Sequence, residues 1–158
     1  MEYVSVGLGV LLVVALGIFS LWRVGRSRSI APELARAAFE QQRIELQRLF
    51  FAAASATGKP RGLIWTGCEF SPGLELARDK RTGELLAFVP VTISFEAVPG
   101  SDMEGLPAVG NLRSATGVFI LRDRRWTTVG RVLFNLDPAE AIRHFQGQYE
   151  RIAASVEA

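Results

Sequence analysis

The hydrophobic positions of this chain change their spacing along the sequence, and the first stretch is apolar without interruption. Residues 4–21 carry no charged side chain. As a helix, the run from Tyr3 to Trp22 would be roughly 30 Å long, which matches the hydrocarbon core of a bilayer. Tyr3 and Trp22 also place an aromatic ring at each membrane interface, where such rings are favoured. The pattern predicts a single transmembrane helix over residues 1–22.

A helical spacing follows from Pro32 to about Ala56. Proline suits the first turn of a helix, and strong helix formers dominate the segment until Gly58 and Pro60 end it. The sequence therefore predicts one continuous amphipathic helix. Its apolar face consists of Ala35, Ala38, Phe39, Leu46, Leu49, Phe50 and Ala53.

The middle of the chain has the spacing of strands. Pro90 lies inside the longest of them and argues for a bend, a bulge or an edge position. Along the same strand Val89, Val91, Ile93, Phe95 and Ala97 face one way, and Thr92, Ser94 and Glu96 face the other. Strands are predicted over residues 63–70, 74–78, 85–98, 112–122 and 126–136.

The end of the chain carries a strong helix signal. Asp137 is a helix-capping residue, Pro138 suits the first turn, and Glu140 completes a capping box. The apolar stripe that follows predicts a helix almost to the C-terminus: Ala141, Ile142, Phe145, Tyr149, Ile152, Ala153 and Val156. The order of helix, about five strands and helix predicts an α+β fold, with the helices packed on one face of an antiparallel sheet.

The charge distribution divides the chain into an anchor over residues 1–22, a basic linker over residues 23–31 and a globular domain over residues 32–158. The formal net charge of +2 is that of Arg23, Arg26 and Arg28 together with Glu2, so the remainder of the chain is neutral. Basic residues are retained on the cytoplasmic side of a membrane, which predicts a cytoplasmic domain at the inner membrane, with these arginines at the bilayer surface. A neutral domain argues against nucleic-acid binding.

Few residues offer chemistry. Cys68 is the single cysteine, so it forms no internal disulfide, and His144 is the single histidine, on the polar side of the predicted last helix. Asp102 and Glu104 share a loop but fall short of the oxygen ligands that calcium prefers. No catalytic residue, metal site or cofactor is predicted, and the sequence favours a protein that is not an enzyme.

Glu96, Arg113 and Arg131 are charged residues inside predicted strands. They either lie on a solvated face of the sheet or line a pocket for a small anionic or polar ligand in its concave side. Such a pocket would also need hydrogen-bonding side chains nearby, from Thr92, Thr116 or Asn135.

Ile44 and Phe51 lie seven residues apart on the side of the first predicted helix that is opposite its apolar face. They form either a contact with a partner helix or a second packing surface within the domain. The leading hypothesis is a membrane-tethered interaction or scaffold domain, whose partner is another protein or a second copy of the chain. The alternative is a membrane-anchored pocket protein that binds or transforms a small ligand.

Several segments between residues 62 and 145 resemble a family of uncharacterised bacterial proteins with a single membrane anchor: residues 77–84 (ARDKRTGE), 91–96 (VTISFE), 108–113 (AVGNLR), 125–128 (RWTT) and 134–141 (FNLDPAEA). The order of elements is also similar to that of cystatin-like and nuclear-transport-factor-like α+β folds, in which a curved sheet cups a helix. The resemblance implies a membrane-anchored domain and brings no known activity.

Overall fold

The computed structural model describes residues 31–57 and 60–153. The expected span over residues 1–22, with Tyr3 and Trp22, lies outside this part of the chain, as do Arg23, Arg26 and Arg28. Among the described helices, none has both the length and the apolar character that a membrane crossing requires.

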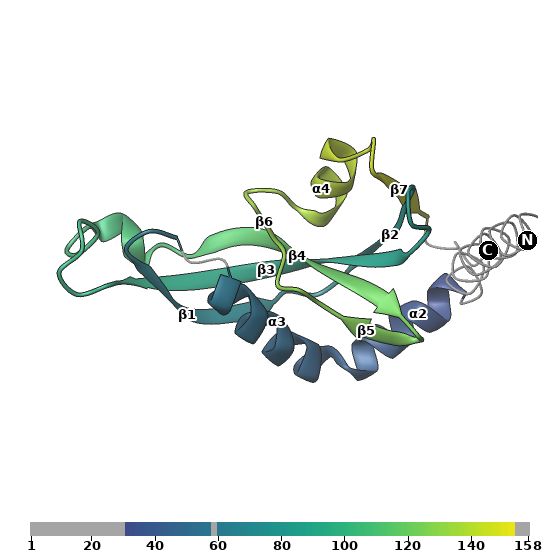
Figure 1. Cartoon of the computed structure of the whole chain (residues 1–158), viewed down its shortest axis with the longest axis horizontal. Helices are drawn as coiled ribbons and strands as arrows, with labels where there is room; N and C mark the ends of the chain where they lie inside the picture. Colours follow the sequence, from purple (N-terminus) through teal and green to yellow (C-terminus); the bar gives the residue numbers. More distant parts are fainter. Residues whose placement is uncertain (1–30, 58–59, 154–158) are drawn as a thin grey trace, which may run out of the picture.

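The described residues form an α+β fold with an antiparallel sheet, as the sequence predicts (Figure 1). Helices α2 (Pro32–Gln41) and α3 (Arg43–Thr57) lie on one face of the sheet, and α4 (Pro138–His144) lies on the other. The prediction that the helices share one face is therefore wrong. The physical reason lies in residues 85–89, an unbroken apolar run that is buried on both faces.

The sheet is built on two long central strands, β3 (Leu85–Ala97) and β4 (Arg113–Arg122), each flanked by two short ones. Along β3, β2 pairs with the first half and β1 with the second half. Along β4, β6 pairs near its start and β5 near its end, and β7 pairs with the free side of β2. The short strands are β1 (Leu63–Phe70), β2 (Glu75–Asp79), β5 (Arg125–Thr127), β6 (Val132–Phe134) and β7 (Tyr149–Ile152).

Pro90 lies at the point where the neighbour of β3 changes from β2 to β1. On the β4 side it is opposite Thr116, and its carbonyl accepts a hydrogen bond from the N–H of Ser71, between the two short strands. The N–H and C=O groups of one strand residue point to the same side of the strand. The N–H that proline lacks would therefore have pointed into the gap between β1 and β2. The strand is thus central, and the proline is tolerated without an edge position.

The predicted first helix is interrupted at Gln42, which has φ −102° and ψ 4°. Beyond the break the buried residues of α3 recur every fourth position, at Leu46, Phe50 and Ala54. Leu49, which was expected in the core, is 45% exposed. The prediction of one continuous helix with a single apolar face over residues 32–56 is therefore wrong.

The last predicted helix is also shorter than expected. Asp137 and Glu140 form the capping box as predicted, but α4 ends at His144. After a turn that contains Gly147, the chain becomes β7, in which Tyr149 is buried. Pairing with the open side of β2 satisfies backbone groups and buries Tyr149, so tertiary pairing overrides the helical spacing.

The predicted strand over residues 126–136 is divided into β5 and β6 by Gly130. With β7, the sheet has seven strands in the described residues where about five were expected. Gly130 has φ +74°, and a Cβ built there would lie 2.4 Å from the backbone nitrogen of Ala54 in α3. Only glycine permits both the left-handed backbone and this approach. The loop between β5 and β6 can therefore rest directly on α3.

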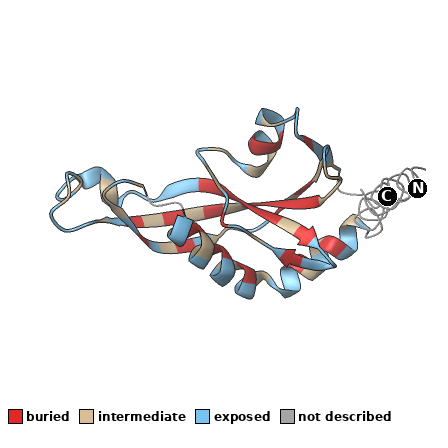
Figure 2. Ribbon diagram, in the orientation of Figure 1, coloured by how far each residue is buried: buried red, intermediate tan, exposed pale blue. Residues whose placement is uncertain are grey.

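Two hydrophobic clusters follow from the two covered faces. The larger one, beneath α2 and α3, contains Phe39, Phe50 and Phe119, and the smaller one, beneath α4, contains Phe88, Ile142 and Tyr149. Figure 2 shows that burial is concentrated where helices face the sheet. The long strands continue beyond this region on one side.

The two ends of the sheet differ. We call the end with residues 80–84 and 123–124, the β2–β3 and β4–β5 turns, the turn end. The start of α2 is fixed there, because the Nε1 of Trp126 donates to the carbonyl of Ala35 at 3.0 Å. We call the end with residues 98–112, which join β3 to β4 and include the 3₁₀ helix η1 (Pro107–Gly110), the loop end (Figure 1).

Candidate functional site

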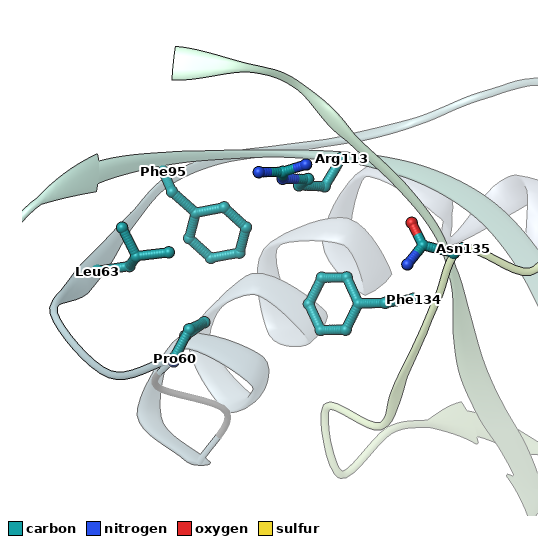
Figure 3. Close-up of a pocket in the computed structure, with 6 residues that line it drawn as sticks. All are labelled: Pro60, Leu63, Phe95, Arg113, Phe134 and Asn135. Atoms are coloured by element: carbon teal, nitrogen blue, oxygen red, sulfur yellow. The ribbon is translucent and has the colours of Figure 1, made fainter. Parts of the chain in front are cut away.

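A pocket of about 280 Å³ lies at the loop end, on the face of the sheet that α3 covers. It is open to solvent, and it begins where α3 has ended and the chain turns into β1 (Figure 3). The six lining residues come from this turn and from four strands or their ends: Pro60, Leu63, Phe95, Arg113, Phe134 and Asn135.

The floor of the pocket is aromatic. The rings of Phe95 and Phe134 lie 6.4 Å apart, and Phe95 also contacts Trp65, with ring centroids 5.3 Å apart. Phe95 is buried, whereas Phe134 is 41% exposed. The pocket exists because β3 and β6 carry apolar side chains past the last turn of α3, which would otherwise cover them.

The rim of the pocket is polar. Arg113 is the first residue of β4 and donates one hydrogen bond to the carbonyl of Ala108 at 3.1 Å. Asn135 has φ +57°, a left-handed conformation that asparagine tolerates better than most residues, and its N–H bonds to the carbonyl of Ser114 at 3.0 Å. Figure 3 shows Arg113 and Asn135 on one side of the two rings, with Pro60 and Leu63 on the other.

This combination fits a particular kind of group. The rings offer apolar contact, and the guanidinium offers donors that match a carboxylate or another oxyanion. Arg113 forms no salt bridge with any described residue, so its charge is available at the rim. The geometry favours an apolar side chain that is followed closely by an acidic group.

The structure does not bring Glu96, Arg113 and Arg131 together, so of the two alternatives for these residues a pocket that all three line does not form. Glu96 pairs with Ile64 and Arg113 pairs with Ile93, and these positions point to opposite faces of the sheet. Glu96 is exposed and lies on the side of the sheet that carries α4.

Arg131 has a different role. Its guanidinium donates to the hydroxyl of Tyr149 at 2.5 Å and lies over the ring of Phe145, 5.4 Å from the centroid. It therefore helps to cover the smaller hydrophobic cluster. Of the hydrogen-bonding side chains considered with these charges, Thr116 is buried and donates to the carbonyl of Leu136 at 2.7 Å, and Asn135 alone lines the pocket with Arg113.

Sequence reasoning missed the apolar half of this site. Phe95 belongs to the alternating pattern of a core strand, and Phe134 to the strand expected after it. The available signal was the length mismatch between a helix ending near Gly58 and strands whose apolar pattern continues to Ala97. A pattern of this kind indicates that some apolar residues lie beyond the covering helix.

Ile44 and Phe51 do not form one exposed strip. Ile44 is 89% exposed on α3. Phe51 is half-buried, and its ring packs edge-on against Trp65 at 6.4 Å, so it belongs to a packing surface within the domain. Ile44 remains an isolated exposed residue on this helix face.

The remaining candidates are apart from the pocket. Cys68 is buried, and burial together with the charge of the neighbouring Glu69 raises its pKa to about 12, so its thiol is protonated at neutral pH. Cys68 packs on the α3 side of the sheet, whereas the exposed His144 lies on α4 at the other face, so the two form no catalytic pair. Glu104 accepts a hydrogen bond from the N–H of Gly100 at 2.7 Å, within its own loop.

Residues 31–57 and 60–153 contain no group of three or more His, Cys, Asp or Glu side chains that could hold a metal ion. The chain matches no family model, and neither the curated proteins nor the solved structures contain a significant match to it.

Proposed function

We propose that this chain is a membrane-tethered interaction domain, held at a bilayer by residues 1–22, which binds a partner through the pocket at the loop end. The observation that carries the proposal is the half-exposed Phe134 beside Phe95, under the free charge of Arg113. Phenylalanine and arginine are both enriched in the buried centres of protein–protein interfaces.

The size and shape of the pocket favour a partner segment over an enclosed small ligand. Ligand pockets usually have volumes of about 300–1,000 Å³ and bury most of the ligand. This pocket, at about 280 Å³, is at the low end of that scale and is open on one side. It suits one apolar side chain of a partner, with an adjacent carboxylate on Arg113 and a backbone or side-chain amide on Asn135.

The tether is proposed from the sequence. An apolar run of bilayer length, flanked by Tyr3 and Trp22 and followed by Arg23, Arg26 and Arg28, favours a domain on the cytoplasmic side. The domain would then act by contact near the inner surface of the membrane, with another protein or with a second copy of itself.

A photo-crosslinking experiment on the full chain in its own membrane tests the proposal. A benzoylphenylalanine in place of Phe134 should give a specific adduct, because the proposed partner contacts this ring. Combining it with Arg113→Glu should reduce the adduct at least severalfold, since the rim charge is reversed. Arg48→Glu, at an exposed site on α3, is the matched control and should leave the adduct unchanged.

Two other positions separate the competing surfaces. The same photoreactive residue at Ile44 tests the exposed position on α3, and at Arg143 it tests α4. An adduct at Ile44 with none at Phe134 would show that the partner binds the outer face of α3 and not the pocket.

Protease treatment of the same cells tests the orientation of the domain. It should leave the domain intact until the membrane is opened, and cleavage in intact cells would contradict the cytoplasmic orientation.

A further inference from the structure

Four basic residues gather at the turn end of the sheet. Lys80 and Arg81 lie in the β2–β3 turn, and Arg124 and Arg125 lie at the β4–β5 turn; all four are exposed. The two turns are neighbours, because Leu85 pairs with Leu121 at the same end of the two central strands. An ion pair between Glu84 and Arg122, 2.7 Å long, joins one turn to the other.

Two acidic groups at this end, Asp79 and Glu84, are engaged by the fold. Asp79 accepts hydrogen bonds from the N–H groups of Arg81 and Thr82, both at 2.8 Å, and Glu84 is held by Arg122. Glu33 lies in the first turn of α2, where the helix dipole favours a carboxylate, and Asp123 is the exposed acid of the β4–β5 turn.

The basic side chains are less engaged. Arg81, Arg124 and Arg125 form no salt bridge with any residue that the structure describes, and Lys80 donates only to the carbonyl of Gln146 at 2.7 Å. Within the two turns, four exposed basic side chains stand against one exposed carboxylate, that of Asp123, so positive charge predominates there, most of it on arginines.

The backbone of the β4–β5 turn supplies a second observation. Asp123 and Arg124 have φ values of +49° and +63°, the conformation of a type I′ hairpin turn. Glycine is the preferred second residue of such a turn, because a side chain in the left-handed region is strained. Here an arginine occupies that place, so the fold tolerates strain while it presents a guanidinium at the tip of the hairpin.

The position of α2 relates this surface to the proposed anchor. Pro32, the first residue of α2, follows Trp22 by ten residues, which span at most about 35 Å when fully extended. α2 begins at the turn end, and the loop end lies a strand length away, roughly 40 Å along β3. A tether of this length permits several orientations of the domain, so charge selects among them.

We infer that the turn end is a lipid-facing surface, on which Lys80, Arg81, Arg124 and Arg125 bind the anionic headgroups of the bilayer that holds the chain. The inference rests on the proposed function for the tether and extends it to the orientation of the domain. Each basic residue at an anionic surface increases membrane affinity about fivefold. The surface would hold the turn end at the membrane and direct the pocket towards the cytoplasm.

Quenching by labelled lipids tests the inference on the full chain in vesicles. A fluorophore is attached to a cysteine introduced at Thr127, an exposed residue of β5 at the turn end, and the quencher is a lipid with a headgroup nitroxide. Cys68 is buried and protonated, so it does not compete for the label. In vesicles with 30% phosphatidylserine we expect strong quenching, which should fall at least twofold in 0.5 M salt or in purely zwitterionic vesicles.

The variants identify the residues responsible. Combining Arg81→Gln, Arg124→Gly and Arg125→Gln should lower the quenching at least twofold. The matched control combines Arg48→Gln, Arg61→Gln and Arg143→Gln, which removes the same charge from exposed positions elsewhere and should leave the quenching unchanged. Arg124→Gly alone should reduce quenching while it raises the melting temperature, because glycine relieves the left-handed strain, so misfolding cannot account for the loss.

The outcomes separate this inference from the proposal on which it rests. A chain that floats with vesicles but shows equal quenching in anionic and zwitterionic lipid overturns the lipid-facing surface alone. Equal losses in the two triple variants overturn it as well, because only net charge would then matter. A chain that does not float with vesicles overturns the anchor and this inference together.

Discussion

The turn end and the loop end of the sheet differ in how their side chains are paired and covered. At the turn end several polar groups bond to other parts of the fold: Trp126 bonds to α2, Glu84 pairs with Arg122, and Asp79 accepts hydrogen bonds within its own turn. At the loop end apolar groups are left with little cover, as Phe134 and Leu112 illustrate. Helix α3 ends at Thr57, so it does not reach the apolar side chains of the loop end.

This difference indicates how the domain divides stability and binding. The covered region holds the large aromatic cluster, and its removal from water provides most of the folding free energy. The loop end leaves apolar side chains such as Phe134 and Leu112 exposed, and we propose that a partner covers them.

The largest test of this comparison truncates one aromatic residue at each end. Trp126 is 3% exposed and packs against Phe39, so Trp126→Ala should lower the free energy of unfolding by about 3–5 kcal/mol. Phe134→Ala should cost only about 1–2 kcal/mol, because the residue is 41% exposed. Urea unfolding of the full chain in mild detergent, followed by circular dichroism, measures both.

A milder variant separates the two roles of Trp126. Trp126→Phe keeps an aromatic ring but removes the side-chain donor to the carbonyl of Ala35, which retains only its bond within α2, and this loss should cost about 1 kcal/mol. Equal losses from Trp126→Ala and Phe134→Ala would contradict the division of roles, because the loop end would then stabilise the fold as strongly as the covered region.

The second test concerns glycines with the same backbone conformation in different surroundings. Gly130 and Gly105 have φ values of +74° and +78°, but a Cβ at Gly130 would collide with α3 while one at Gly105 would meet nothing within 4 Å. Gly130→Ala should cost roughly 3 kcal/mol, from strain and overpacking together. Gly105→Ala, in the loop end, should cost about 1 kcal/mol, from strain alone.

The difference between these two variants isolates the contact with α3. Thermal melts of the two proteins measure it directly, since both carry the same new methyl group. A Gly130→Ala variant as stable as Gly105→Ala would show that the loop between β5 and β6 is free to move away from α3.

Local patterns in the sequence predicted the elements better than their boundaries. The alternation in residues 89–96 correctly assigned the buried side of β3, and Asp137 with Glu140 correctly placed the start of α4. Both features depend on neighbours within a few residues. The change from helix to strand before Tyr149 depends on pairing with β2, and the only local signal for it is Gly147; the break at Gln42 has no comparable local signal.

The candidate site was predicted only in part for the same reason. Arg113 was identified as a charged residue within a strand and Asn135 as a group that could join it. Glu96 lies on a solvated face of the sheet, which was one of the two alternatives, whereas Arg131 packs over Phe145 and Tyr149, which was neither of them. Which face a residue occupies is set by register between strands, and the register between β3 and β4 places Arg113 and Glu96 on opposite sides. Sequence spacing alone does not contain that register.

The smallest expected effect concerns the ion pair that joins the two turns at the turn end. The hydrogen bond from Arg122 is the main reason that the pKa of Glu84 is lowered in the folded protein. A lowered pKa stabilises the fold above the pKa of the unfolded chain, and this contribution is lost as the pH falls through the folded pKa. Glu84→Gln should therefore reduce stability at pH 7 by at most about 1 kcal/mol, since Arg122 is largely exposed. The difference from wild type should close as the pH falls below about 4.

Urea unfolding at a series of pH values measures this difference. Glu45→Gln, which removes one partner of the exposed Glu45–Arg48 pair on α3, is the control and should change stability little. A gap between Glu84→Gln and wild type that persisted at low pH would mean that the carboxylate acts through packing and not through its charge, and that the two turns are held together by their backbones alone.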